Sequence, residues 1–333
     1  MIEASAPVRI CDNGGWTDTW FGGPGRVLNV AVTPGVEVSI ASTDRSTVGP
    51  DPIVLDVGGF GDRYPIVPGE PRVARHPLLE AAIDARPPPE GPVEITVRSV
   101  VPAGCGAGTS AAVAVALLGA LTAARSEAVS ARDIAYAAHR LEVEVLGVES
   151  GIQDQLSSAF GGISYLEIET YPEATLETLP AWRELGPRLT LVFLGRPHDS
   201  SSIHLQVIEG LGAAKTAALS DLRGAAVASR VAVIDQDFDA FGRAMIANTD
   251  AQRALHPELV GLDARAVIEV AAAHGALGWK VNGAGGDGGS VTILNPTGVA
   301  KARLETAVAA MDPRYRVLPI EISPTGLQVR GAL

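Results

Sequence analysis

The sequence predicts an α+β protein of two domains, and its length, order of elements and apolar content carry that prediction. Its 333 residues exceed the ~100–200 residues that are usual for one domain. Strand-like and helix-like segments follow one another irregularly in both halves, which is typical of α+β proteins rather than of regular βαβ winding. With 47% apolar and 19% charged residues, the chain can bury a sizeable core and is too apolar for a disordered chain.

The first half contains strand-like segments and two helix-like ones. Four segments have the alternation or β-branched content of strands: Val8–Ile10, Val27–Val32, Val36–Ala41 and Val93–Val100. Pro34-Gly35 separates the middle two, and the three prolines of Arg86–Pro92 predict a surface loop. Helices are expected at Ala111–Ala124 and from the capping-box-like Ser130-Ala-Arg-Asp133 to about Gly147, before a strand at Ile163–Ile168.

The pattern loses its periodicity and gains proline and glutamate over Tyr171–Gly186, where we place the domain boundary. The predicted domains are therefore residues 1–180 and 186–333. In the second domain, helices are expected near 203–211, 217–234, 237–250, 261–274 and 299–311. Strands are expected at Leu189–Leu194, Gly278–Asn282, Ser290–Leu294, 315–322 and 326–330.

Charge and composition argue against several classes of protein. The net charge of −12 argues against a general nucleic-acid binder, because such proteins carry a basic surface. Only two cysteines, Cys11 and Cys105, are present, which favours a reduced compartment over a disulfide scaffold. No signal peptide precedes the first strand, and no apolar run reaches the ~18 residues needed to span a bilayer. We expect a cytoplasmic enzyme without nucleic-acid or membrane partners.

A glycine-rich turn, Pro102–Gly108, leads directly into the first predicted helix. Three alternate positions of this turn are glycines that can adopt positive φ and let a ligand approach the backbone: Gly104, Gly106 and Gly108. The helix that begins near Thr109 offers unpaired N–H groups and the positive end of its dipole, so the segment favours a polyphosphate. The hydroxyls of Thr109 and Ser110 could bind Mg²⁺ or a phosphate oxygen. A strand–turn–helix junction packed with glycine is the alternative, and no Walker A sequence follows.

A second glycine cluster, Lys280–Gly289, lies between two predicted strands. Gly283, Gly285 and Gly288 satisfy G-x-G-x-x-G, but this dinucleotide fingerprint must open a helix, whereas a strand follows here. We interpret the cluster as a flexible cover over a ligand, with a long hairpin loop as the alternative.

Three of the acidic residues after the first glycine turn form a third candidate motif: Glu142 and Glu144 in the second predicted helix, and Asp154 after it. Phosphoryl transfer needs a divalent cation and often a carboxylate that orients or deprotonates the acceptor hydroxyl. The two glutamates flank the apolar stripe of the predicted helix on opposite sides, so only one can face the glycine turn. Solvated glutamates and a helix N-terminal aspartate are the plain alternatives.

These motifs, in this order, resemble the GHMP small-molecule kinases, such as galactokinase, homoserine kinase and mevalonate kinase. The family's phosphate loop, Pro-x-x-x-Gly-Leu-Gly-Ser-Ser-Ala, is similar to Pro102–Ala111, with Ala107 for Leu and Thr109 for Ser. Its C-terminal glycine loop is similar to Lys280–Gly289. The resemblance covers essentially the whole chain and implies an N-terminal domain like ribosomal protein S5 domain 2 and a ferredoxin-like C-terminal domain.

Within the family, the sugar-kinase branch resembles the chain most. Arg9 followed by Gly14-Gly-x-Thr-Asp18 is similar to the sugar-binding opening of galactokinases, fucokinases and heptose 7-phosphate kinases. Gln153-Asp154-Gln155 is similar to the heptose-kinase catalytic segment, whereas Trp16 is similar to the Gly-Gly-Trp-Ser-Asp of fucokinases. The resemblance implies an enzyme of carbohydrate metabolism that uses ATP and Mg²⁺ to phosphorylate a sugar or sugar phosphate, at the anomeric hydroxyl as in heptose 7-phosphate 1-kinases.

The resemblance also implies roles, carried over position by position. Asp154 would be the catalytic base, and Arg9 would stabilise the transferring phosphoryl group. Mg²⁺ would bind to Glu142, or to Glu144, and to Ser110 or Thr109. The implied nucleotide-binding residues are Pro102, Gly104, Gly106, Ala107, Gly108, Thr109, Ser110, Gly283, Gly285 and Gly286. The implied acceptor-binding residues are Gly14, Gly15, Trp16, Thr17 and Asp18, whose carboxylate would hold sugar hydroxyls.

Two departures from the family pattern bear on nucleotide binding. Asp287 stands where the family's second loop usually carries glycine, which places a negative charge close to the expected phosphates. Asn282 replaces a more usual Thr or Leu. Because the chain is acidic, it must build a positive site from backbone amides, a helix end, Arg9, Mg²⁺ and, as one candidate, Lys280.

Alternatives within and outside this class stay open. A phosphorylated acceptor would need further cations, for which Arg196, His198 and His204 are candidates. A fucokinase-like enzyme, a kinase of another small alcohol and a catalytically silent sensor of sugar and ATP are the rival functions. The identity of the sugar, the hydroxyl that is phosphorylated and the presence of a homo-oligomer are left open.

Overall fold

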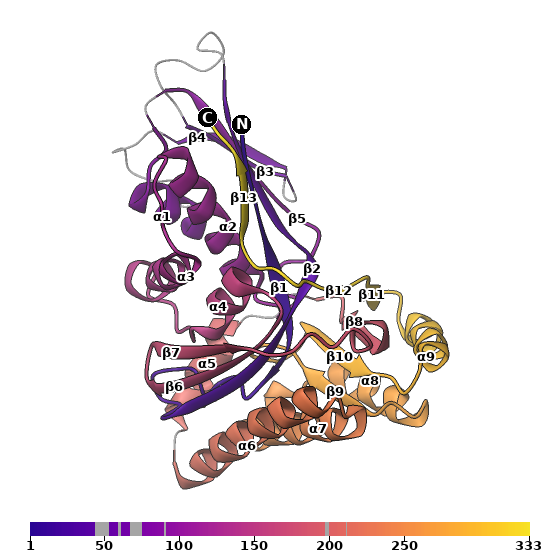
Figure 1. Cartoon of the computed structure of the whole chain (residues 1–333). Helices are drawn as coiled ribbons and strands as arrows, with labels where there is room; N and C mark the ends of the chain where they lie inside the picture. Colours follow the sequence, from indigo (N-terminus) through magenta and orange to yellow (C-terminus); the bar gives the residue numbers. More distant parts are fainter. Residues whose placement is uncertain (44–52, 59–60, 67–74, 90, 197–199, 211) are drawn as a thin grey trace.

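The structure, a computed structural model, describes residues 1–43, 53–58, 61–66, 75–89, 91–196, 200–210 and 212–333. Two sheets organise these residues, a large one built mostly from the first half and a small one from the second half (Figure 1). The α+β class predicted from the sequence is confirmed. Among the described residues, no helix is both long and apolar enough to cross a membrane.

The large sheet has nine strands in the described part of the chain and follows the order β13-β1-β2-β5-β3-β4, with β12 and β6 also paired to β2, and β7 to β6. Its pairs are antiparallel except β3 with β5. The strands are β1 Ile2–Asn13, β2 Gly25–Ser42, β3 Ile53–Val57, β4 Asp62–Ile66, β5 Val93–Ser99, β6 Ile163–Thr170, β7 Glu173–Thr178, β12 Glu321–Ile322 and β13 Gln328–Gly331.

Four helices cover one face of this sheet (Figure 1). They are α1 Pro77–Ala85, α2 Thr109–Ala124, α3 Ala131–Arg140 and α4 Gln153–Phe160. Helix α2 is apolar on every side and lies buried among the others, as its alanine-rich sequence predicts. Ser130 caps α3 by accepting the N–H of Asp133 at 3.1 Å, which confirms the predicted capping residue. The sequence interpretation missed α1, β3 and β4.

Strand β2 corrects the prediction that Pro34-Gly35 separates two strands, because one strand runs through both residues. The register with β1 shifts between Ala6 and Val8, so Pro34 lies at an irregularity of the ladder, where its missing N–H costs no hydrogen bond. A side chain at Gly35 would place its Cβ 2.1 Å from the carbonyl oxygen of Ala6, so only glycine allows this approach.

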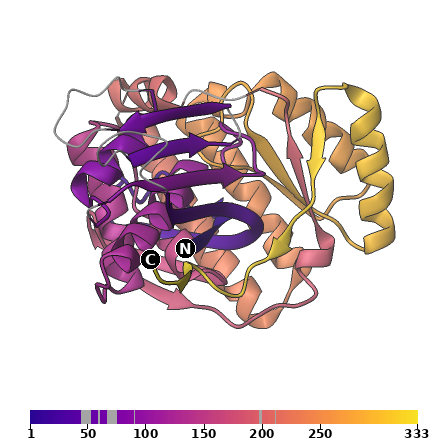
Figure 2. The same ribbon diagram turned by 90° about the horizontal axis from the view of Figure 1, so that it is seen from above.

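The small sheet is antiparallel and has the order β11-β8-β10-β9. Its strands are β8 Leu189–Phe193, β9 Gly278–Val281, β10 Ser290–Leu294 and β11 Arg316–Leu318; α8 Leu262–Ala273 and α9 Gly298–Met311 pack against it. The other helices of this half are α5 Ser200–Glu209, α6 Ala213–Asp235 and α7 Phe238–Leu255. Helices α6 and α7 form a hairpin that also contacts β1, so the two parts lie side by side (Figure 2).

The segment predicted to be the domain boundary contains β7, which pairs with β6 as a hairpin. The sequence interpretation missed this strand because most of its residues are exposed and it lacks an apolar face. Strands β12 and β13 return from the second half to the large sheet. The domain boundary between residues 180 and 186 stays a prediction. The pairing of β12 with β2 and of β13 with β1 places these two C-terminal strands in the large sheet.

Candidate active site

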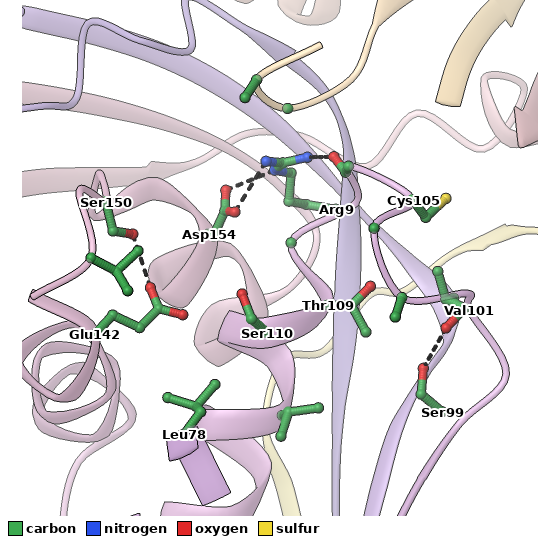
Figure 3. Close-up of a pocket in the computed structure, with 18 of the residues that line it drawn as sticks. Arg9, Leu78, Ser99, Val101, Cys105, Thr109, Ser110, Glu142, Ser150 and Asp154 are labelled. Carbon is green, nitrogen blue, oxygen red and sulfur yellow. Dashed lines mark hydrogen bonds and ion pairs between the residues drawn. The ribbon is translucent and has the colours of Figure 1, made fainter. Parts of the chain in front are cut away.

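A cavity of about 900 Å³ brings the predicted motifs together (Figure 3). The glycine turn before α2, the middle of β1, the first residues of α4 and the start of the second glycine loop all contribute to its walls. Segments from both halves of the chain therefore meet in one site, although more than 100 residues of sequence separate the two glycine loops.

The glycine turn has the backbone geometry that the sequence predicts. Gly104, Gly106 and Gly108 all have positive φ, at 69°, 76° and 67°, and Gly108 caps α2 in the left-handed conformation. The unpaired N–H groups at the start of α2 lie at the cavity wall, beside the exposed Ser110. In the part of the chain that the structure describes, the buried Oγ1 of Thr109 has no hydrogen-bond partner. An anionic ligand would satisfy these donors.

Arg9 and Asp154 form a bidentate ion pair at the centre of the cavity (Figure 3). Arg9 Nε lies 2.8 Å from Asp154 Oδ1, and Arg9 Nη2 lies 3.0 Å from Asp154 Oδ2. Arg9 Nη1 also donates to the carbonyl oxygen of Gly106, which joins the pair to the glycine turn. Burial alone would lower the pKa of Arg9, but the nearby carboxylates raise it above its usual range, so the guanidinium stays charged.

A π-helical turn, Leu141–Val145, continues α3 and contains both candidate glutamates, Glu142 and Glu144. Glu142 is buried at the cavity wall, where its Oε2 accepts hydrogen bonds from Ser150 Oγ at 2.9 Å and Gln155 Nε2 at 2.7 Å. Glu144 is exposed and does not line the cavity. Burial raises the pKa of Glu142 to about 7, although the hydrogen bonds oppose this shift. π-turns recur at functional sites, and of the two glutamates in this turn Glu142 is the one that lines the cavity.

The predicted acceptor-binding segment is a tight loop between β1 and β2. Gly14 N donates to Asn248 Oδ1 at 2.6 Å, and Thr17 Oγ1 donates to the carbonyl oxygen of Gly14 at 2.7 Å. Trp16 has a φ of 81°, unusual for a bulky residue, and packs among apolar side chains of α5, α6 and α7. Trp16 lines the cavity, whereas Gly14, Gly15 and Thr17 shape the loop behind it.

Asp18 lies in the middle of this loop and faces the cavity with a buried carboxylate. Its Oδ2 accepts the backbone N–H of Gln153 at 3.1 Å, and its Oδ1 accepts Gln153 Nε2 at 3.3 Å. A Cβ at Gly151 would lie 1.8 Å from Asp18 Oδ2, so glycine is required for this approach. Burial raises the pKa of Asp18 to about 7.

The second glycine loop joins β9 to β10 and meets the glycine turn at Gly283. A Cβ on Gly283 would lie 2.8 Å from the carbonyl oxygen of Gly106, so the two loops touch through their backbones. Gly285 and Gly286, predicted to bind nucleotide, instead pack against Leu259 and do not line the cavity; Gly286 N donates to the Leu259 carbonyl at 3.2 Å. Ala107 is likewise buried behind the cavity wall and accepts the backbone N–H of Arg9 at 2.9 Å.

The structure changes the interpretation of three charged or polar positions of this half. Asp287 is exposed, does not line the cavity and lies near Gly261. Asn282 is buried and accepts the N–H of Cys11 at 3.2 Å while it donates to Ser290 and Thr292, which ties β1 to the small sheet. Lys280 does not reach the cavity, because it is buried against Asp12.

The side chains that could bind the phosphate of a phosphorylated acceptor differ from those expected. Arg196 pairs with Asp263 at 2.8 Å and does not line the cavity. His198 and the side chain of His204 lie outside the described residues. Arg75 and Arg316, which the sequence interpretation missed, do line the cavity. Each is far from the glycine motifs in the sequence and carries no local signal.

Sequence comparisons identify kinases as relatives. Residues 73–162 match the family model described as GHMP kinases N terminal domain. A mevalonate kinase of Pyrococcus furiosus is 29% identical over 251 residues, which cover 72% of this chain and 70% of the relative. A D-glycero-alpha-D-manno-heptose 7-phosphate kinase of Campylobacter jejuni is 24% identical over 204 residues, covering 60% of each.

Solved structures share the whole fold. A D-glycero-D-manno-heptose 1-phosphate kinase from Bacteriodes thetaiotaomicron superposes with a TM-score of 0.78 at 20% identity and covers 99% of both chains. This likeness confirms the predicted two-domain fold, and at this identity it speaks for the fold alone.

Proposed function

Because this chain carries the GHMP kinase N-terminal domain and its homologues are kinases that transfer phosphate to alcohol groups, we propose that it is an ATP- and Mg²⁺-dependent kinase of a sugar or sugar phosphate. The acceptor is the anomeric hydroxyl. The observation that carries the proposal is the meeting of a phosphate-binding turn, the Arg9–Asp154 pair and the buried Asp18 in one cavity. This arrangement has a place for a polyphosphate, a base for a hydroxyl, and an acceptor of hydrogen bonds from further hydroxyls.

Asp154 is the base in this proposal. Its side chain is 24% exposed, so one carboxylate can keep its pair with Arg9 and still meet an acceptor hydroxyl. As the hydroxyl oxygen attacks the γ-phosphorus, its proton passes to Asp154 and the bond to the leaving ADP oxygen breaks. Arg9 holds the carboxylate in place and puts a fixed positive charge beside the glycine turn, where negative charge develops on the transferring group.

Glu142 and Ser110 are the residues that would hold Mg²⁺. A carboxylate and a hydroxyl together with phosphate oxygens are the ligands that Mg²⁺ takes in kinases, and the buried Glu142 gains from a cation because its charge is poorly solvated. Figure 3 shows Ser110 beside Glu142, with which it has a side-chain hydrogen bond. The ion would neutralise the triphosphate.

In this proposal, the adenine ring of ATP binds on the other side of the glycine turn. Ser99 and Val101 lie across the turn from Asp154, and Leu78 lies below Ser110 in the same view (Figure 3). Further apolar side chains line this part of the cavity: Val57, Leu79, Val97 and Val113. An apolar slot with few polar groups is typical of a site for a flat heterocycle.

The relatives also favour a second candidate, a kinase of a carboxylate-bearing alcohol such as mevalonate. The acceptor end favours a polyol, because Asp18 and Glu149 line it and can accept hydrogen bonds from hydroxyls. Thr19, Ser150 and Gln153 line the same end and offer hydrogen bonds to hydroxyls.

A coupled assay of ADP release tests the proposed function. The panel contains fucose, galactose, mannose, arabinose, glucuronate, heptose 7-phosphate and mevalonate, each with ATP and Mg²⁺. Turnover of one sugar or sugar phosphate, with the product located by ³¹P–¹³C coupling at the anomeric carbon, supports the proposal. Turnover of mevalonate alone contradicts it, and ATP binding without ADP release across the panel identifies a silent sensor.

Glu142→Gln is expected to raise the Mg²⁺ concentration required for half-maximal turnover by roughly 10- to 100-fold, because the amide removes the anionic ligand. The measurement is turnover against Mg²⁺ at fixed ATP. Glu144→Gln is the matched control, since Glu144 is exposed two residues away, and it should leave the Mg²⁺ requirement unchanged. Equal behaviour of the two variants would remove Glu142 from the metal site.

Acceptor binding is expected to weaken as the pH falls below about 7. The raised pKa of Asp18 means that its carboxylate takes up a proton in this range, and the protonated group accepts fewer hydrogen bonds from acceptor hydroxyls. Calorimetric titration with the acceptor from the screen, without nucleotide, should give a Kd that rises toward about tenfold per pH unit in this range. Asp18→Asn should bind weakly with a flat profile; a pH slope that persists in this variant would contradict the assignment.

A further inference from the structure

The end of β1 turns Asp12 toward the active site. Along a regular strand, Arg9 and Asp12 would point to opposite faces. The register with β2 shifts between Ile10 and Asn13, and Cys11 adopts a φ of 52°. This irregularity brings Asp12 Oδ2 to 3.9 Å from Arg9 Nη2, on the same side of the sheet. Bulges next to active sites commonly re-aim a side chain in this way.

Asp12 uses both carboxylate oxygens on the second half of the chain. Its Oδ1 lies 3.1 Å from Lys280 Nζ, and its Oδ2 accepts the backbone N–H of Gly283 at 3.1 Å. The side chains of Asp12 and Lys280 are each 1% exposed, so the ion pair is buried. A buried ion pair is a weak source of stability because both ions lose their hydration. We therefore look for the role of the Asp12–Lys280 pair in where it holds the backbone, and not in the stability that it adds.

Gly283 is held from both sides of its peptide backbone. Asp12 accepts its N–H, and Gln252 Nε2 donates to its carbonyl oxygen at 3.2 Å. Gln252 is itself oriented by Asn248 Nδ2, which donates to its Oε1 at 3.2 Å. The held residue is the one whose backbone touches Gly106 in the first glycine turn.

We propose that Asp12 is a positioning residue for the nucleotide: through Lys280 and the N–H of Gly283 it holds the second glycine loop against the first, so that both loops meet the phosphates in one fixed geometry. Gln252 is the second tether of the same residue. The inference rests on the proposed nucleotide-dependent function. It assigns to Lys280 a structural partner in place of a direct phosphate contact.

Asp12→Asn tests the proposal, because it keeps the volume of the side chain and removes the charge that pairs with Lys280. Calorimetric titration with ADP and Mg²⁺ should show a Kd raised by roughly 10- to 100-fold, the usual effect of losing a charged hydrogen bond. The Kd of the acceptor, measured alone, should change by less than about twofold. Hydrogen exchange of the peptide containing residues 283–289 should become faster than in the wild type, since its tether is lost.

Asn295→Ala is the matched control for a merely structural loss. Asn295 is buried, donates to the carbonyl of Arg188 at 2.9 Å and lies outside the cavity wall. It should lower the melting temperature and leave the ADP Kd unchanged. If Asp12→Asn does not fold, Gln252→Met removes the second tether, and its ADP Kd should rise about three- to tenfold.

The outcomes separate this inference from the proposed function. A folded Asp12→Asn, or Gln252→Met where it replaces that variant, with wild-type ADP affinity and wild-type exchange overturns the positioning role and leaves the proposed kinase intact. A lowered melting temperature with unchanged ADP affinity does the same, because it describes a structural pair. A wild-type protein that does not bind ADP overturns the proposed function and this inference together.

Discussion

Asp154→Asn is expected to lower kcat by about 10²- to 10⁴-fold, the usual contribution of a positioned general base. The amide cannot take the proton of the acceptor hydroxyl, and it replaces the charged pair with Arg9 by a neutral contact. The measurement is ADP release at saturating ATP and acceptor. ADP affinity, measured by calorimetry, should remain within a few-fold of the wild type because the glycine turn is unchanged.

Asp287→Asn is the control for this experiment. It makes the same chemical change on an exposed carboxylate of the second glycine loop, outside the cavity wall, and should leave kcat unaltered. If Asp154→Asn releases ADP at the wild-type rate, Asp154 is not the general base. A large loss in Asp287→Asn would show instead that the charge of the second loop acts on the nucleotide.

Arg9→Met is expected to lower kcat/KM by at least about 10³-fold, which is the lower end of the effect of an arginine on a transferring phosphoryl group. The substitution removes the charge beside Gly106 and also frees the carboxylate of Asp154 from its fixed orientation. Arg9→Lys should recover little of the loss, because an ammonium group cannot make the paired hydrogen bonds to both oxygens. Steady-state kinetics and a thermal melt of each variant provide the measurement.

Arg230→Met is the matched control for Arg9. Arg230 also forms a two-point pair, with Glu177 at 2.7 and 3.0 Å, but this pair is exposed and outside the cavity. It should leave kcat/KM unchanged, since exposed ion pairs contribute little. A kcat/KM within tenfold of the wild type for a folded Arg9→Met would contradict the role of Arg9.

Local sequence patterns predict the parts of the site that depend on local backbone geometry. The alternate glycines of residues 104–108 predict a turn of positive φ before a helix, and the structure has it. The helical wheel predicts that one of the two glutamates faces this turn, and in the structure Glu142 is the one that lines the cavity. The φ values of the turn's own residues set its geometry, whereas Glu142 is held by Ser150 and Gln155, 8 and 13 residues later.

The parts that sequence reasoning missed depend on contacts between distant segments. Asp12 pairs with Lys280, 268 residues later in the sequence, and an irregular strand end aims it there against the normal alternation. Gly285 and Gly286 have the composition of a phosphate loop, yet their neighbours in space come from Leu259 and Val260. None of these contacts leaves a trace in a short window of sequence. Strand β7 was missed for a different reason: it pairs with the adjacent β6, but it has too few buried residues to show an alternating pattern.

The pairing of β13 with β1 has a consequence for the order of folding. Residues Ile2–Ser5 take their outer neighbour from Gln328–Gly331, so the two paired strands are separated by more than 300 residues of synthesis. Until β13 leaves the ribosome, this edge of β1 presents unpaired backbone groups that can pair with other chains. The helices of the second half can form meanwhile from local contacts. The large sheet therefore stays incomplete until residues 328–331 have been made, and a chaperone that shields the edge of β1 during synthesis should raise the yield of folded protein.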